Sequence, residues 1–323
     1  MIQLKRINEK DEFLKIDDLI NDSLNGTIFH TKKFLNYHKN KFKGKDEWYI
    51  FLRKNKIIGV ISFLIKVEGN NCNLGISPFG ASYGGIVLFK RITYKVANEM
   101  IHALIEKFKY KKIKSFKFTH PISCCLKEKC DILEFAMLKN NFKIVNRDIS
   151  SVIRLKNFNE INQKITPRVK RNINKAIKNN VKIKHHASLN DFWIPLKETF
   201  IKHKTNPTHT YEELKILEEI YKEDLNFCVA YLREKPIASS LVFKVNNLVV
   251  NTFYLCQTEE GSKIQALSYL ISEIMSFYKK DGYDFLDLGT SSVNMIPREN
   301  IFEFKEGFSS EGFFRDSYYW EPN

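Results

Sequence analysis

Long apolar runs are missing from this chain of 323 residues. No window approaches the roughly 20 consecutive apolar residues that a helix needs to cross a bilayer. The opening residues, MIQLKRINEKDEFLKIDDLI, also lack the apolar core and small-residue cleavage site of a secretory signal. We therefore expect a protein without a membrane span that stays in the cytoplasm.

Cysteine pairs with metal-binding spacing are missing as well. None of the six cysteines forms a C-x-x-C pair, and no spacing between them matches a zinc site. A P-loop and the Ser-His-Asp order of a catalytic triad are also missing. We expect reduced, mostly buried thiols and no metal ion. The cysteines are Cys72, Cys124, Cys125, Cys130, Cys228 and Cys256.

Basic residues, by contrast, are in excess. The chain has 52 lysines and arginines against 37 acidic residues, a formal net charge of +15. Such a charge favours a nucleic-acid or phosphate-bearing partner. Lysine is common along the whole chain, however, together with Asn and Ile, so only a local concentration of charge indicates a site.

The order of predicted elements occurs twice. With 43% hydrophobic residues, a chain of this length can build about two cores. Periodicity predicts β-α-α-β-β-β-α-β-α-β in residues 1–155 and the same order in residues 156–323. The last strand of the first half carries an expected break near Asp148. We predict two α+β domains, each a mixed, mostly antiparallel sheet flanked by helices.

A basic helix is predicted over residues 167–180. Between residues 161 and 190 there are eight positive charges and no acidic residue. Thr166 and Pro167 favour a helix start. Arg168 and Arg171 then share one face of the first turn, where cations oppose the helix dipole unless an anion offsets them. Either the two arginines bind a phosphate, or they belong to a solvated face of a lysine-rich protein.

Polar groups gather near the end of the chain. A short apolar strand, FLDL, contains Asp287 and ends in the polar loop GTSS, which includes Ser291 and Ser292. The run FKEGF then places Lys305 between aromatic residues. In a partly dry site the ammonium of Lys305 would act strongly on developing negative charge; alternatively its stem only covers apolar surface. Asp287 either points into a functional opening or bonds structurally to the loop.

The element order resembles that of the GNAT acyltransferase fold, and a tandem pair of such domains resembles the FemABX and BioF2-like acyltransferases. The motifs that carry the resemblance are spread over nearly the whole chain. They are IFHT at 28–31, SYGG at 82–85, RNINKA at 171–176, FLDLG at 285–289 and FKEGF at 304–308.

This resemblance implies transfer of an acyl group to an amine. Strands four and five of such a domain splay apart, and an extended acyl donor binds in the opening. Here the opening would lie between residues 248–256 and 285–288, lined by Tyr254, Ser291 and Ser292, with Lys305 as a catalytic residue and Asp287 as an amine binder or proton relay. The donor's phosphates would rest on Gly261, Ser262 and Lys263, although Glu259 and Glu260 stand where the CoA-binding pattern has other residues.

The first domain offers candidates for the acceptor side. His30 and His120 are expected at its open end, either as hydrogen-bonding wall residues or as a general base. Tyr83 and Gly84 would let backbone and phenol approach a sugar or peptide, or else serve a tight turn. The second domain would be the acyl-donor side.

The resemblance therefore favours an N-acyltransferase that uses acetyl-CoA or another acyl-CoA. The acceptor would be an amino sugar, nucleotide-linked and destined for a surface glycan. An aminoacyl-tRNA-dependent transferase that builds peptide bridges is the first alternative. A non-catalytic nucleic-acid-binding protein is the second, although most aromatics lie in periodic, core-like runs.

Overall fold

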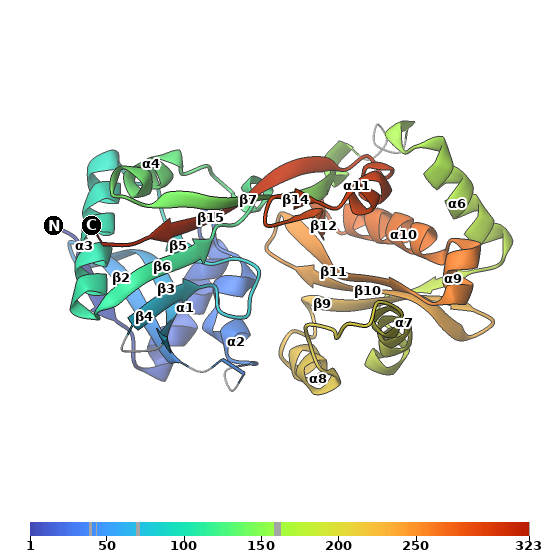
Figure 1. The fold of residues 1–323 in the computed structure, drawn as a ribbon, viewed down its shortest axis with the longest axis horizontal. Coiled ribbons are helices and arrows are strands. Elements are labelled where there is room, and N and C mark those ends of the chain that lie inside the picture. Colours follow the sequence, from blue (N-terminus) through green and yellow to red (C-terminus); the bar gives the residue numbers. More distant parts are fainter. Residues whose placement is uncertain (39–40, 43, 69–71, 158–162, 323) are drawn as a thin grey trace. The chain divides into compact units, whose positions relative to one another are not determined.

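The computed structural model describes residues 1–38, 41–42, 44–68, 72–157 and 163–322. The chain divides into two compact units. Unit 1 comprises Met1–Asp148 and Phe314–Asn323, and unit 2 comprises Ile149–Phe313. Each unit is a mixed α+β structure with its own core (Figure 1).

The strands of unit 1 follow the order β1-β2-β3-β4-β6-β15, and β5 pairs with the first half of β3. All of these pairings that are described are antiparallel except that of β4 with β6. Its elements are β1 (Gln3–Arg6), α1 (Lys10–Asp22), the 3-10 turn η1 (Ile28–His30), α2 (Lys32–Leu35), β2 (Lys45–Arg53), β3 (Lys56–Glu68), β4 (Cys72–Ser77), β5 (Gly85–Leu88), α3 (Tyr94–Tyr110), β6 (Ile113–Thr119), the 3-10 turn η2 (Ser123–Cys125), α4 (Asp131–Lys139) and β7 (Lys143–Arg154).

The core of unit 1 lies between the sheet and the helices α3 and α4. Tyr49, Phe63 and Phe116 point from the strands toward Met100 and Phe108 of α3, and all five side chains are buried. Trp48 follows the strand alternation to the opposite face of β2, where it meets Phe13 of α1. Helices therefore cover both faces of this sheet.

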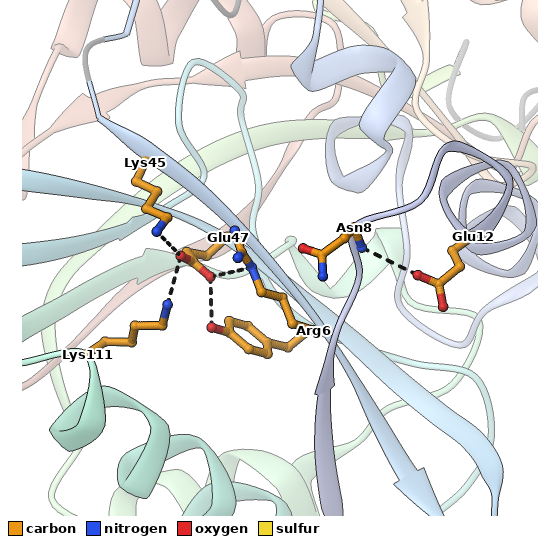
Figure 2. A network of polar contacts seen from close by, with 7 residues as sticks. Arg6, Asn8, Glu12, Lys45, Glu47 and Lys111 are labelled. Atoms are coloured by element: carbon orange, nitrogen blue, oxygen red, sulfur yellow. Dashed lines mark hydrogen bonds and ion pairs between the residues drawn. The ribbon is translucent and has the colours of Figure 1, made fainter.

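A buried carboxylate anchors the edge of this sheet. The side chain of Glu47 is fully buried, yet three cations reach it: Arg6, Lys45 and Lys111. The hydroxyl of Tyr49 donates a fourth contact at 2.8 Å. Figure 2 shows these groups converging from β1, β2 and the turn after α3. Burial by itself would raise the pKa of Glu47, but these hydrogen bonds and cations outweigh it and hold the pKa below its usual range.

Unit 2 repeats the plan with the strand order β7-β12-β11-β10-β9-β8. Helices α10 and α6 pack on one face, and α7 packs on the other through Phe192, which contacts Phe227 and Tyr254. Its elements are the 3-10 turn η3 (Leu155–Asn157), α6 (Pro167–Lys178), β8 (Lys182–Lys184), α7 (Leu189–Lys202), α8 (Tyr211–Ile220), β9 (Leu225–Leu232), β10 (Lys235–Lys244), β11 (Val249–Gln257), α9 (Glu259–Ile264), α10 (Ala266–Lys280), β12 (Phe285–Thr290), β13 (Ser292–Val293), β14 (Ile296–Pro297), α11 (Glu299–Glu306) and β15 (Glu311–Trp320).

The last strand of each half leaves the unit in which it began. β7 starts in unit 1, and its residues 150–154 pair with β12 of unit 2. β15 starts in unit 2, and its residues 317–320 pair with β6 of unit 1. The boundary predicted from the sequence, between residues 155 and 156, does not include this exchange. Alternation of apolar residues predicts a strand but not its partner.

The described cysteines are thiols. Cys124, Cys125, Cys228 and Cys256 are buried thiols, and Cys130 is half-buried. The side chain of Cys72 lies outside the described part. No group of three or more His, Cys, Asp or Glu residues suited to a metal ion occurs among the described residues. No helix among them has the length and apolar character to cross a membrane.

Candidate functional site

Two neighbouring strands of unit 2 separate part of the way along. β11 and β12 run parallel and pair at Val249–Phe285, Val250–Leu286 and Asn251–Asp287. Over residues 249–290, which are described throughout, the pairing ends there, although β11 continues to Gln257 and β12 to Thr290. We call the unpaired stretch beyond Asn251 and Asp287 the opening. On its β12 side, the Asp287 carbonyl, the Gly289 amide and the carbonyls of Gly289 and Thr290 are bonded to side chains.

Asp287 marks the point where the strands separate. Its carboxylate is buried and accepts hydrogen bonds from Ser150 Oγ at 2.5 Å, Asn251 Nδ2 at 2.9 Å and the Gly289 amide at 2.8 Å. Its backbone carbonyl also accepts from Asn251 Nδ2 and from Thr252 Oγ1. These bonds favour the alternative in which Asp287 has a structural role and fixes the geometry of the opening.

Lys305 reaches this opening from α11. Lys305 is only 5% exposed, and its Nζ donates to the carbonyl oxygens of Gly289 at 2.7 Å and Thr290 at 2.9 Å. A Cβ built on Gly289 would lie 4.0 Å from Lys305 Nζ and 3.9 Å from the Thr252 carbonyl oxygen. The ammonium thus lies at the end of β12, and because it has three N–H groups it retains one for a ligand.

Burial alters the acidity of this lysine. The pKa of Lys305 is lowered to about 8, mainly by desolvation. The nearby charge of Asp287 opposes this shift, and that of Arg298 adds to it. At pH 7 about nine in ten Lys305 side chains are still protonated. The site therefore holds a positive charge in a largely dry environment, where charge acts more strongly than in water.

The serines of the GTSS loop bind strand β7. Ser291 Oγ lies 2.7 Å from Ser151 Oγ, and Ser292 Oγ accepts from the Ile149 amide at 2.9 Å. Both serines are buried. They hold the loop beside the opening rather than presenting their hydroxyls to it.

The predicted phosphate loop has another structure. Residues 261–263 lie within the short helix α9, where the Gly261 amide donates to Thr258 Oγ1 and the Ser262 amide donates to the Thr258 carbonyl. A Cβ on Gly261 would approach the Ile237 carbonyl oxygen to 2.2 Å, so glycine is needed here for packing on β10. Lys263 pairs with Glu259 at 2.8 Å on the surface. These groups do not fit a pyrophosphate cradle, because the amides are already bonded.

The basic helix α6 is joined to the helix that carries Lys305. The carbonyl of Gly307, next to α11, accepts from the Thr166 amide at 3.0 Å. A Cβ on Gly307 would lie 2.8 Å from Cγ2 of Val169, so the two helix ends are in close contact. Arg168 and Arg171 follow on the first turns of α6 and are both exposed. Cations thus stand at the α11 end of this basic helix.

Tyr254 belongs to the other face of the unit 2 sheet. Its hydroxyl lies 2.9 Å from His209 Nδ1 and accepts from the His209 amide at 3.1 Å. Its ring packs against Phe192 and Phe200 of α7. The structure therefore places this side chain in the wall beneath α7.

The candidate residues of unit 1 do come together. His30 Nδ1 bonds to Thr27, while its buried Nε2 lacks a hydrogen-bond partner among the described atoms. Burial lowers the pKa of His30 to about 4, and the charge of His120 lowers it further. Burial also lowers the pKa of His120. Both imidazoles are consequently neutral at pH 7. Tyr83 is buried close by, between Phe29 and the guanidinium of Arg315.

The corresponding strands of unit 1 do not open. β4 and β6 pair from Asn73–Ile113 to Ser77–Phe118, close to the end of both strands. Beyond them the Gly84 amide donates to the Thr119 carbonyl at 2.8 Å. A Cβ on Gly84 would approach the backbone nitrogen of Pro78 to 2.4 Å, so this bridge requires glycine. The chain itself fills the position that the opening occupies in unit 2.

Three polar residues of the unit 2 site were missed in the sequence. Ser150 and Asn251 complete the shell around Asp287, and Arg298 begins α11 and acts on Lys305. Asn251 is a polar residue inside an otherwise apolar strand, which is a readable signal. Ser150 is brought in by the exchanged strand β7, and no local pattern reveals it.

No family model matches the chain, and no curated protein matches it in sequence. Solved structures do resemble it in fold. FemX is 11% identical with a TM-score of 0.75, over 99% of this chain and 98% of FemX. L-PGS from Bacillus licheniformis is 12% identical with a TM-score of 0.61, over 99% and 94% of the two chains. A tandem GNAT protein from the clavulanic acid biosynthesis pathway is 8% identical with a TM-score of 0.55, over the full length of both. The chain therefore has the fold of FemX and of tandem GNAT proteins.

Proposed function

We propose that the protein is an N-acyltransferase whose acyl-transfer centre lies in unit 2, at the opening between β11 and β12. The observation that carries the proposal is Lys305, a buried ammonium with one remaining N–H, which lies at the end of β12 where its pairing with β11 has stopped. An extended acyl donor would bind in this opening, and its carbonyl oxygen would meet the ammonium.

The proposed reaction is attack of a neutral amine on a thioester or ester. The new C–N bond forms as the C–S or C–O bond breaks, and the amine nitrogen loses the proton that the leaving group gains. Lys305 stabilises the negative charge that develops on the acyl oxygen, and Asp287 holds the strand ends in place for it through Ser150 and Asn251.

We propose an amino sugar, linked to a nucleotide, as the acceptor. Support comes from the exposed Arg168 and Arg171 on α6, since arginines bind phosphate in a bidentate manner. His30, Tyr83, Gly84 and His120 of unit 1 remain proposed acceptor contacts. An acceptor of this kind suits the synthesis of surface glycans in the cytoplasm.

The donor is proposed as an acyl-CoA bound through its extended arm, with its phosphates away from residues 261–263, whose amides are already bonded. An aminoacyl-tRNA donor is the second candidate. The fold of FemX and the net charge of +15 favour it.

Binding experiments separate the two donors. Thermal shifts would be measured with acetyl-CoA and longer acyl-CoAs, each with and without a nucleotide-linked amino sugar, and in parallel with aminoacyl-tRNA. Stabilisation by an acyl-CoA that grows with the sugar nucleotide supports the first donor. Binding of charged tRNA with a steep salt dependence, and no response to any acyl-CoA, would replace it with the second.

Replacing Arg168 and Arg171 together by Gln tests the acceptor. We expect at least a tenfold loss of affinity for the sugar nucleotide with an unchanged melting temperature, because both side chains are exposed. The matched control replaces Lys175 and Lys178, near the other end of α6, by Gln. Equal losses in both variants would contradict a phosphate site at the helix start.

A further inference from the structure

An apolar face is exposed on helix α4 of unit 1. Ile132, Phe135 and Leu138 recur at every third residue of this helix and are 44%, 59% and 41% exposed. Tyr94, at the start of α3, is 43% exposed and its ring lies 5.7 Å from that of Phe135. We call these four residues the α4 patch. Large apolar side chains gathered in this way commonly mark an interaction site.

A cavity of about 490 Å³ adjoins the α4 patch and shares Ile132 with it. Its other apolar lining comes from Leu24, Ile92 and Cys130, and four charged residues, Arg91, Glu128, Lys129 and Asp131, also line it. Apolar surface is thus available both on the helix and in the hollow beside it.

The surroundings of the patch are basic. Lys90 and Lys95 flank the start of α3, Lys129 lines the cavity, and Lys139 ends α4; no ion pair is present for any of them among the described residues. Of the nearby carboxylates, Glu128 pairs with Arg91. Glu134 accepts from the neutral Tyr318 hydroxyl and keeps its charge, so Glu134 and Asp131 stand against the four lysines. The rim of the patch therefore carries a net positive charge.

The apolar side chains of the α4 patch and its positively charged rim together indicate the kind of partner. A second copy of the chain would bring a like-charged rim and a like net charge of +15 against it, so self-association is disfavoured. An anionic lipid surface satisfies both features, because aromatic and aliphatic side chains enter the headgroup region while lysines meet the phosphates. We infer that the α4 patch docks unit 1 on an anionic membrane surface.

The experiment is flotation of the full-length protein with vesicles of phosphatidylcholine alone or of phosphatidylcholine and phosphatidylglycerol. The net charge alone attracts any face of the protein to anionic vesicles, so the decisive comparison uses two variants of equal charge change. Phe135→Glu alters the patch, and Ile201→Glu alters an equally exposed apolar residue of α7 in unit 2, 65% exposed. Both positions are on the surface, so both variants are expected to fold.

We expect the wild type and Ile201→Glu to float with anionic vesicles at low salt and not with neutral ones. Phe135→Glu is expected to reduce binding at least tenfold. Lys129→Glu together with Lys139→Glu is expected to do the same, since each basic residue near such a surface contributes roughly 1 kcal/mol, about fivefold. Absence of binding to anionic vesicles would overturn the inference. Equal binding by Phe135→Glu and Ile201→Glu would also overturn it and would indicate that the α4 patch binds a protein instead.

Discussion

Lys305 combines three properties that distinguish it from a surface lysine. It is almost completely buried, it donates to two backbone carbonyls at the end of β12, and it retains a third N–H beyond those two bonds. A lysine that only covered apolar surface would extend its ammonium into solvent. These properties support the proposed catalytic role of Lys305, which stays a prediction.

The charge of Lys305 leads to a prediction about the pH dependence of kcat/KM. Because its pKa is lowered to about 8, the ammonium is lost as the pH rises through 8. If the positive charge stabilises the oxyanion, kcat/KM falls above pH 8. In Lys305→Arg, which stays protonated, this fall in kcat/KM is expected at higher pH. A general base would give the opposite profile, with kcat/KM rising to a plateau near pH 8.

The same pKa predicts a pH dependence of stability. A lysine whose folded pKa lies below its unfolded value of about 10.4 binds more protons when unfolded. The free energy of unfolding should therefore rise between pH 8 and pH 10 relative to Lys305→Met, in which this contribution is missing. Urea titrations at both pH values measure the difference, and parallel behaviour of the two proteins would contradict a buried ammonium.

Asp287→Asn tests the shell around the opening. The amide cannot accept from all three donors, so we expect a loss of about 1–3 kcal/mol in the free energy of unfolding. Loss of the carboxylate charge should also lower the pKa of Lys305 and shift the fall in kcat/KM to lower pH. Asp281→Asn, at an exposed ion pair with Lys244, is the control, with an expected cost below about 1 kcal/mol.

At the scale of elements, the separation of β11 and β12 is the feature on which the proposal rests. Gly289 has a φ of +80° at the open end of β12, and Gly282 has a φ of +89° in a turn with no atom within 4 Å of an added Cβ. Alanine at either position costs about 1–2 kcal/mol in backbone strain. Only at position 289 would the methyl group enter the opening, near Lys305 and Thr252.

We therefore expect Gly289→Ala to raise the KM for the acyl donor several-fold while Gly282→Ala leaves it unchanged. Melting temperatures should fall by similar amounts in the two variants. If both variants bind donor equally well, the donor does not lie between β11 and β12.

Much of this element pattern was predictable from the sequence. The repeated order of helices and strands, the turn at 54–56 and the basic helix capped by Thr166 all appear in the structure, because apolar periodicity and cap residues act locally. Local signals also singled out Asp287 and Lys305, whose roles in catalysis stay predictions.

The missed features depend on contacts between distant segments. Gly261 reads as part of a phosphate loop but is fixed by its approach to Ile237, 24 positions earlier in the chain. Tyr254 reads as a site residue, yet its hydroxyl is held by His209. Ser150 reaches Asp287 only because β7 joins the sheet of unit 2. None of these contacts leaves a periodic trace in the sequence.

At the scale of the whole molecule, each unit has its own core and receives one strand that began in the other. Trp320, at the end of the chain, is buried in unit 1 against Phe108 and Phe142. The stability of unit 1 therefore depends on the last residues of the chain.

Trp320→Ala should destabilise unit 1 by about 3–5 kcal/mol. Hydrogen exchange should accelerate in α3 and β6 and stay slow in α10 of unit 2. Phe308→Ala, which opens the core of unit 2, should give the reverse pattern. Faster exchange of α10 alone in Trp320→Ala would contradict the assignment of β15 to unit 1.

The most direct test of the central claim is product formation by wild type and Lys305→Ala, followed by mass spectrometry. Each protein would be incubated with a panel of acyl-CoAs and, separately, aminoacyl-tRNAs, against nucleotide-activated amino sugars. The account predicts an acylated amine with the wild type and at least a hundredfold less with Lys305→Ala, whose fold and donor binding are retained. Equal turnover by the two proteins, or no acyl transfer from any donor, would contradict it.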